Sequence, residues 1–484
     1  MTTGEARISK NHRLLRIAGL LVIALAVAAC RRPESVMPPV PTPSITAPVV
    51  VTRSPTATPQ PAATETPVVA TPAPFATPAG LLPASSPCGI LLDPLPEIAT
   101  SAVRLSVSTT TRASLRAQAP PAAWPALERL LNTPQTVGLA AFQAGRESEG
   151  VYLNADLPMP LASVAKLIIL VAYAEAVADG ALHPQEQISL AELDRYYLPN
   201  FDLGAHRQAI DELRRNDRLI SPDSDPAVTL QDVAWMMIRH SSNAAADYLH
   251  LRLGRQRIEE TAIALGLNDA PASHSAPCTF LGQFLMQANH SRTADNDRAF
   301  LTAFAEGGPE GAAAYGAAVA QLADTYINDD IFRADEQAWR TATRRPSIDI
   351  QRYFAGRLAP QGTAGAYAEL MSRLAQNGLS NADSSYQARL ILEWPNQFDA
   401  NQELFSNVGY KNGSLAGVLN SAYYAYRWGD AAPVIVVLFF RDIPQQTYRS
   451  WRFDLPHDEL ARWLLADPAA IPALAAALRD SAEP

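Results

Sequence analysis

Ser163 and Lys166 have the spacing of a nucleophile and its base. They lie three positions apart near the start of an apolar run, 161–178, which predicts a buried helix. Side chains at i and i+3 share one face of a helix, so the amine can reach the hydroxyl. Burial favours the neutral form of a lysine, and a neutral amine can take the proton of a serine hydroxyl. The spacing therefore indicates acyl transfer through a serine nucleophile.

The distribution of lysine in the chain supports this interpretation. Of the 39 Lys and Arg residues, only three are lysines: Lys10, Lys166 and Lys411. Arginine stays protonated at physiological pH, whereas a buried lysine can serve as a base. Lys10 falls in an N-terminal targeting segment, so the mature chain keeps lysine at two positions. Both of these positions lie inside candidate motifs.

A second motif is Ser241-Ser242-Asn243, at a junction between two helical patterns. A serine and an asparagine two residues apart can point a hydroxyl and an amide into one cleft. Taken alone, the motif would be read as helix capping, which is the commoner use of Ser and Asn.

A third motif, Lys411-Asn412-Gly413-Ser414, lies on a predicted strand. Strand alternation puts Lys411 and Gly413 on the same face. We predict that Gly413, which has no side chain, lets a substrate lie against the backbone there. Taken alone, this motif would be read as a glycine-bearing edge strand.

The elements that must position these motifs predict an α+β fold, an α/β sandwich. Two strand patterns precede Ser163 and three follow the helical patterns, at 137–142, 150–153, 408–414, 419–426 and 434–440. A last helix is predicted near 458–465. We therefore expect a five-stranded antiparallel sheet built from both chain ends, together with a mostly helical subdomain. Within a domain spanning 87–484, residues 291–358 are predicted to form a helical insertion.

In this order, the three motifs resemble the S-x-x-K, S-x-N and K-x-G motifs of class A β-lactamases and penicillin-binding proteins. The resemblance covers 124–465 and implies a β-lactamase/transpeptidase-like fold. It implies that Ser163 is the acylated nucleophile and that Lys166 activates it. Ser241 would relay a proton to the leaving nitrogen, and Asn243 would bind the substrate amide. Lys411 would support the Ser241 hydroxyl and the substrate carboxylate.

The same resemblance assigns Gly413 and Ser414 to substrate binding. The backbone N–H groups of Ser163 and Ser414 would form an oxyanion hole, a feature worth about 3 kcal/mol in acyl transfer.

The group that would release the acyl chain does not follow from this pattern. Class A β-lactamases use a glutamate in an E-x-x-L-N loop between the second and third motifs, and no such pattern occurs between Asn243 and Lys411. The literal match at Glu128 to Asn132 precedes the nucleophile and is read as part of a helix. The segment Ser273 to Thr279 carries no carboxylate. A Y-x-N triplet at Tyr326 to Asn328 lies in the predicted insertion and is rejected as a site.

Three functions therefore stay open. The first is a β-lactamase-like serine hydrolase acting on a β-lactam or a related amide or ester. The second is a D-alanyl-D-alanine peptidase of the cell wall, whose substrate is a peptidoglycan-type peptide. The third is a penicillin-binding sensor that is acylated without turnover.

Composition excludes other classes of function. The net charge of -9 and the lack of a basic stripe argue against nucleic acid as a partner. The eight histidines form no H-E-x-x-H or Cys/His cluster, so no metal site is predicted. No cofactor is predicted either.

The N-terminal part predicts a tethered protein of the cell envelope. Residues 1–30 combine basic residues with a short apolar run that ends in small residues before Cys30, which resembles a bacterial lipobox with Cys30 as the lipidated residue. Residues 31–86 are rich in Pro and Thr and predict a disordered linker. We therefore expect an extracytoplasmic lipoprotein anchored to a membrane at Cys30. Cys88 and Cys278 are compatible with one disulfide or with two thiols.

Overall fold

The computed structural model describes residues 105–267, 278–288, 297–342 and 346–480, all within the unit Phe75–Pro484. The predicted targeting segment, the linker, Cys30 and Cys88 lie outside these residues.

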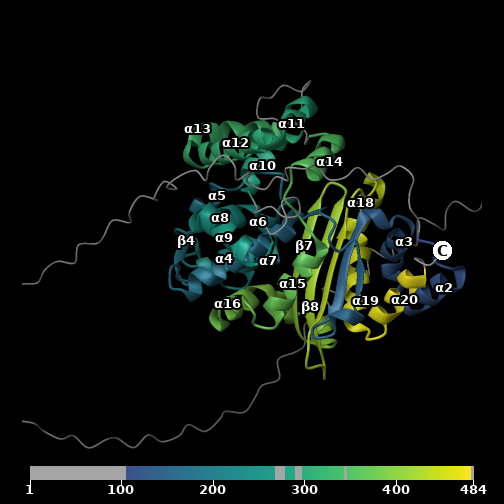
Figure 1. Ribbon diagram of the computed structural model, residues 1–484. Coiled ribbons are helices and arrows are strands. Elements are labelled where there is room, and N and C mark those ends of the chain that lie inside the picture. Colours follow the sequence, from purple (N-terminus) through teal and green to yellow (C-terminus); the bar gives the residue numbers. More distant parts are fainter. Residues whose placement is uncertain (1–104, 268–277, 289–296, 343–345, 481–484) are drawn as a thin grey trace, which may run out of the picture. The chain divides into compact units, whose positions relative to one another are not determined.

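The centre of the fold is a five-stranded antiparallel sheet, which confirms the expected fold class (Figure 1). The strand order is β2-β1-β9-β8-β7, so strands from both chain ends meet in the middle, where β1 pairs with β9. The strands are β1 Val137–Gln143, β2 Val151–Leu153, β7 Phe405–Leu415, β8 Val418–Arg427 and β9 Val434–Phe440. β7 is an edge strand of this sheet, and it carries the third motif.

Alternation along β9 shows why its sequence is continuously apolar. Ile435, Val437 and Phe439 belong to the apolar core on one face of the sheet, whereas Val436 and Leu438 belong to the core on the other. Both faces are covered, so every side chain of the strand is buried.

Helices from the two chain ends cover one face of the sheet. α19 packs against β8, β9 and α3, and α20 packs against α2 (Figure 1). These helices are α2 Thr109–Gln118, α3 Trp124–Asn132, α19 Pro456–Ala466 and α20 Ala470–Asp480, and α18 Gln445–Asp454 directly precedes α19 in the chain. Among the described helices, none alone is long and apolar enough to cross a membrane. α19 and α20 pass that test only as a pair, and the pair is bent by 110°.

The other face of the sheet packs against α15 and a helical part centred on α4. Ten of the thirteen residues of α4 are buried, so this helix forms the interior around which its neighbours pack. These helices are α4 Lys166–Ala178, α5 Leu190–Asp194, α6 Ala205–Arg215, α7 Leu230–Arg239, α8 Asn243–Leu253, α9 Arg255–Ala264, α15 Ala364–Ala375, α16 Ala382–Leu392 and α17 Asp399–Gln402. Two small sheets join them, β3 Met159–Pro160 with β6 Gln361–Gly362 and β4 Gln187–Ser189 with β5 Ala227–Thr229.

A group of five helices, the helical cap, lies along one end of this arrangement (Figure 1). It consists of α10 Phe280–Gln287, α11 Asp297–Ala305, α12 Gly308–Asn328, α13 Asp330–Ala342 and α14 Ile348–Arg357, so the described part of the predicted insertion is helical. The cap has its own apolar cluster, and α10 crosses α12 closely enough that a Cβ on Gly282 would lie 2.2 Å from the Val319 carbonyl oxygen. Cys278, just before α10, is buried and disulfide-bonded. Its partner falls outside the described residues.

Local structure differs from the sequence expectation at the start of the run 161–178. This run begins as a 3₁₀ turn, Ala162–Ala165, and becomes α-helical only at Lys166. Apolar periodicity continues across this break, so it did not reveal it. The second motif lies at a junction between two helices, α7 and α8, as predicted, and Ser241 has a positive φ of 63° there.

Candidate active site

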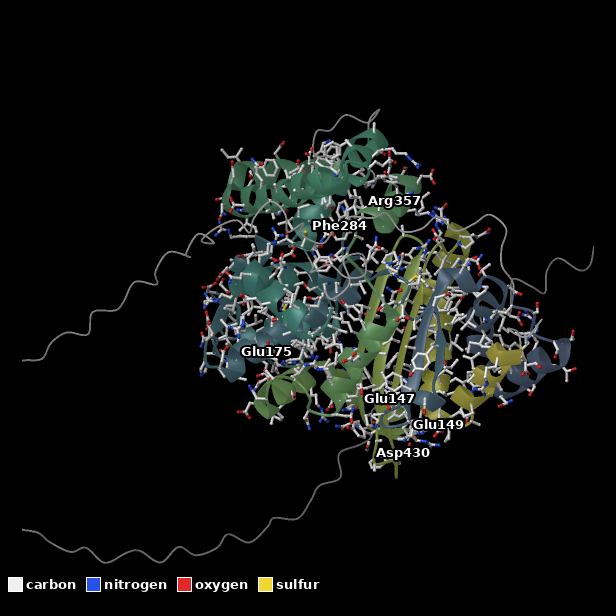
Figure 2. All side chains as sticks on the ribbon, viewed as in Figure 1. Glu147, Glu149, Glu175, Phe284, Arg357 and Asp430 are labelled. Carbon is white, nitrogen blue, oxygen red and sulfur yellow. The ribbon has the colours of Figure 1, made fainter. Side chains whose placement is uncertain are left out.

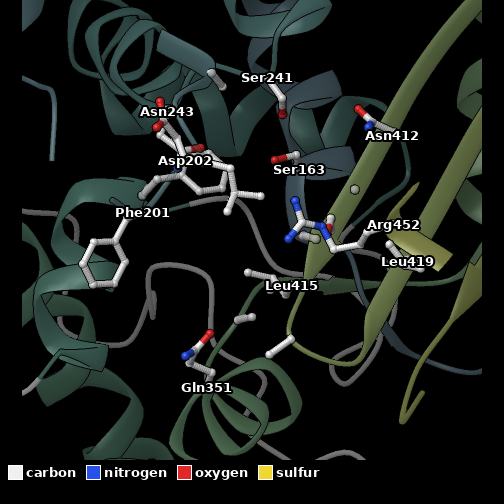
Figure 3. Close-up of a pocket in the computed structure, with 18 of the residues that line it drawn as sticks. Ser163, Phe201, Asp202, Ser241, Asn243, Gln351, Asn412, Leu415, Leu419 and Arg452 are labelled. Carbon is white, nitrogen blue, oxygen red and sulfur yellow. The ribbon is translucent and has the colours of Figure 1, made fainter. Parts of the chain in front are cut away.

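A cleft of about 930 Å³ lies between the edge strand β7, the helical part and the cap. Ser163, Ser241 and Asn243 line it together with Gly413 and Ser414, so the structure brings the three motifs to one place (Figure 3). The cap contributes an apolar and amide wall made by Phe280, Gln283, Phe284, Gln287, Gln351 and Phe354. Phe284 belongs to α10 of the cap, whereas Glu147, Glu149 and Asp430 lie at the end of the molecule away from the cap (Figure 2).

Ser163 and Lys166 are positioned by the turn that starts α4. The Nζ atom of Lys166 lies 3.2 Å from the Oγ atom of Ser163, as the i, i+3 spacing predicts. Ala162, the residue before the nucleophile, has a positive φ of 50°, a strained conformation for a residue with a side chain. This strain is local to the turn that presents Ser163 to the cleft.

The amine of Lys166 is the centre of the site. It is fully buried beneath the cleft, and besides Ser163 it contacts Ser241 Oγ at 3.2 Å, Ser241 O at 2.7 Å and Asn243 Oδ1 at 2.7 Å. Burial lowers the pKa of Lys166 from 10.5 to about 7, and the carboxylates of Asp247 and Asp202 oppose this change. A substantial fraction of the amine is therefore neutral near pH 7 and able to accept a proton.

Lys411 reaches the same hydroxyl from the sheet. Its Nζ atom lies 3.0 Å from Ser241 Oγ, 3.0 Å from Asn412 O and 3.1 Å from Asn412 Oδ1. These contacts use the three donors of a lysine, and the side chain is 1 % exposed. Burial lowers the pKa of Lys411 well below its ordinary value, and Lys166 lowers it further.

Gly413 lines the cleft, and it also lets two backbone segments approach each other closely. A Cβ atom there would lie 2.6 Å from the Leu161 carbonyl oxygen and 3.2 Å from the backbone nitrogen of Ser163. The space beside Gly413 is thus filled by the turn that carries the nucleophile, so the glycine lets β7 and this turn approach each other. The sequence placed Lys411 and Gly413 on one face, as found, but assigned that space to the substrate.

Ser414 points to the other face of β7, where its hydroxyl lies 2.9 Å from the hydroxyl of Tyr448 on α18. This contact links the edge strand to α18, which also carries Arg449 and Arg452 along the cleft. Arg452 is among the cleft-lining residues labelled in Figure 3. Neither arginine forms an ion pair within the described part of the chain.

Phe280, at the start of α10, occupies the space beside Lys166. The centroid of its ring lies 4.5 Å from Lys166 Nζ. The position of the ring is set by Asp247 on α8, whose carboxylate accepts the backbone N–H groups of Phe280 at 2.7 Å and Leu281 at 2.6 Å. Burial raises the pKa of Asp247, an effect that these N–H groups and Lys166 oppose.

Two carboxylates are found among the described residues that line the cleft, Asp202 and Asp458. Asp202 accepts the backbone N–H groups of Gly204 at 2.9 Å and His206 at 2.8 Å. Asp458 accepts the hydroxyls of Tyr410, Ser421 and Tyr423. Each carboxylate thus has partners of its own.

Sequence reasoning missed Phe280, Asp247 and Arg452. None of them lies in a motif, and Phe280 and Asp247 reach the site through tertiary contacts that no local pattern encodes. The two rejected motifs do lie elsewhere. Glu128 pairs with Arg112 at 2.9 Å on the far face of the sheet, and Tyr326 donates to the Tyr197 carbonyl. In the described ranges, no group of three or more His, Cys, Asp or Glu side chains is placed to hold a metal ion.

Similar solved structures include a beta-lactamase from Sphaerobacter thermophilus (16 % identity, 76 % of this chain and 100 % of that chain, TM-score 0.40). PBP-A (14 % identity, 78 % and 100 %, TM-score 0.40) and a beta lactamase from Xanthomonas campestris (15 % identity, 76 % and 98 %, TM-score 0.39) are others. No curated protein matches the chain.

The beta-lactamase enzyme family matches residues 124–451. This range is more than half of the chain and includes every motif from Ser163 to Ser414. The chain therefore belongs to the beta-lactamase enzyme family.

Proposed function

We propose that the protein is a serine hydrolase that forms an acyl-enzyme at Ser163 with a β-lactam or a related amide or ester. One observation carries the proposal: the buried amine of Lys166, with a pKa lowered to about 7, lies 3.2 Å from the hydroxyl oxygens of both Ser163 and Ser241. A base that contacts both hydroxyls can move a proton from one to the other.

The acylation step follows from these contacts. Ser163 Oγ attacks the carbonyl carbon, and its proton passes to Lys166 Nζ. When the C–N bond breaks, the leaving nitrogen takes the proton of Ser241, and Lys166 returns a proton to Ser241 Oγ. Lys411, 3.0 Å from the same oxygen, orients that hydroxyl. The acyl group ends on Ser163, and Lys166 is neutral again.

Arg452 is the group we propose for the substrate carboxylate. The resemblance assigned this role to Lys411, but the three donors of Lys411 are engaged and its side chain does not line the cleft. A guanidinium that lines the cleft can instead donate two hydrogen bonds to a carboxylate.

The neighbourhood of Lys166 favours slow release of the acyl group. Phe280 places an aromatic ring there, and a ring cannot take a proton from a water molecule. This observation supports the second candidate, a D-alanyl-D-alanine peptidase of the cell wall, for which fast hydrolysis of a penicilloyl group is not needed.

For the location of the protein, we propose that it is an extracytoplasmic lipoprotein anchored to a membrane at Cys30. The support is the order of basic, apolar and small residues before that cysteine. Mass spectrometry of the mature N-terminus is expected to find an acylated Cys30, and an unmodified chain that retains residues 1–29 would contradict the anchor.

The experiment that tests the function is to follow a labelled penicillin on the purified mature chain. We expect a covalent adduct, whose decay rate separates the candidates. Loss of the adduct within seconds supports a β-lactamase, whereas persistence for hours together with hydrolysis of a D-Ala-D-Ala peptide supports the peptidase. Persistence without peptide hydrolysis indicates the sensor, and absence of any adduct refutes the proposal.

A further inference from the structure

Ser242 is the buried residue of the second motif. Its side chain is fully buried, whereas Ser241 and Asn243 on either side line the cleft. Its Oγ atom accepts the backbone N–H of Ala245 at 3.2 Å and so caps α8. Since solvent is excluded, the hydroxyl proton of Ser242 needs an acceptor inside the protein.

His206 supplies that acceptor. Its Nδ1 atom lies 3.0 Å from Ser242 Oγ, and its Nε2 atom lies 3.1 Å from Oδ1 of Asp194. A carboxylate only accepts hydrogen bonds, so in neutral His206 we assign the proton to Nε2. Nδ1 then accepts the hydroxyl of Ser242. The ring is fully buried, and the Asp194 side chain, which is 61 % exposed, determines its tautomer.

These three residues join α5, α6 and the turn between α7 and α8, and both α6 and this turn contribute residues to the cleft. Asp194 ends α5, His206 lies in the first turn of α6, and Ser242 lies between α7 and α8. The backbone N–H of His206 also donates to Asp202, a residue of the cleft. Ser241 itself has a positive φ of 63°, and a residue held in such a conformation depends on the contacts of its neighbours.

We propose that Asp194, His206 and Ser242 are positioning residues that hold the Ser241 hydroxyl where it delivers a proton to the leaving nitrogen. They have the residue types of a Ser-His-Asp triad, but Ser242 is fully buried and cannot meet a substrate in the cleft. The inference rests on the proposed function, because Ser241 acts during acylation of Ser163.

Two acyl donors distinguish positioning of this proton from general loosening of the site. A penicillin needs a proton on its leaving nitrogen, whereas an N-acylglycine thioester releases a thiolate, which leaves without one. Misplacing the Ser241 hydroxyl therefore slows acylation by the penicillin but not acylation by the thioester. A general loss of structure slows both.

Asp194→Asn is the first variant, because the side chain is exposed and the change preserves its shape. Its amide can donate to Nε2, which moves the ring proton to Nδ1, opposite Ser242. The acylation rate constant is expected to fall at least about tenfold for the penicillin and less than about threefold for the thioester. Ser242→Ala removes the hydroxyl directly and is expected to give the same pattern.

The matched control is Asp211→Asn. Asp211 is also exposed and lies on α6, where it forms an ion pair with Arg214 and no hydrogen bond to Asp194, His206 or Ser242. This variant is expected to change neither rate. Equal losses for both donors, or unchanged rates in both variants, would overturn the inference. A wild-type protein that is acylated by neither donor would overturn the proposed function, and the inference with it.

Discussion

The lowered pKa of Lys166 predicts how acylation depends on pH. Burial brings this pKa from 10.5 to about 7, so the amine is the base only above the midpoint. Acidification protonates Lys166 and removes the acceptor for the Ser163 proton. The acylation rate constant is therefore expected to rise with pH through a midpoint near 7 and to level off above about pH 8.

The size of the effect follows from the two pKa values. At pH 7, an ordinary lysine is neutral in about 0.03 % of molecules, whereas one with a pKa of about 7 is neutral in roughly half. The buried site thus raises the population of the base by about three orders of magnitude. Lys166→Arg keeps a positive charge but cannot supply a neutral base, so it is expected to slow acylation by about 10²–10⁴-fold.

Stopped-flow measurement of adduct formation between pH 5.5 and 9 checks both statements. The penicillin carboxylate stays ionised throughout this range, and hydrolysis of the compound in buffer alone provides the background. A flat profile, or a Lys166→Arg variant within tenfold of the wild type, would refute the assignment of Lys166 as the base.

Three residues around the nucleophile carry separable predictions. Phe280→Glu puts a carboxylate beside Lys166 and is expected to shorten the adduct lifetime more than about tenfold, as followed by mass spectrometry. Phe280→Leu should leave the lifetime unchanged. Equal lifetimes in the wild type and both variants would contradict the proposal that the ring at this position slows release of the acyl group. Arg452→Gln should lower the acylation efficiency of a penicillin about tenfold but not that of its methyl ester. Equal losses for acid and ester would argue against a carboxylate contact. Gly413→Ala should cost about 1–3 kcal/mol in the free energy of unfolding and abolish acylation, because its Cβ would lie 2.6 Å from the Leu161 carbonyl oxygen; a wild-type denaturation curve and rate would contradict this.

Much of the fold could be predicted from the sequence, because its periodic signals are strong. The strand 434–440 was predicted with the bounds that β9 has, and the pairing of strands from both chain ends followed from the element order. The helices α18 and α20 were not predicted. α18 is mostly polar with one buried residue, Trp451, and therefore lacks an apolar stripe for a sequence argument to find.

The candidate site was predictable where motif residues act directly, and not where unrelated segments meet. The contact between Ser163 and Lys166 follows from their i, i+3 spacing. Ser241 and Lys411 join them through contacts between distant segments, which only the resemblance of the three motifs had implied. The ring of Phe280 reaches Lys166 through a tertiary contact that no local pattern encodes.

The hydrogen bond between Ser242 and His206 was not predicted for the same reason. These residues are 36 positions apart, on elements whose mutual packing the sequence alone does not specify.

Locating the acyl group on the chain tests the central claim most directly. The mature protein is treated with a penicillin, digested and mapped by mass spectrometry beside Ser163→Ala. The penicilloyl mass is expected on the peptide that contains Ser163, with no adduct in the variant. An adduct that persists in Ser163→Ala, or one that maps to another serine in the wild type, would contradict the account.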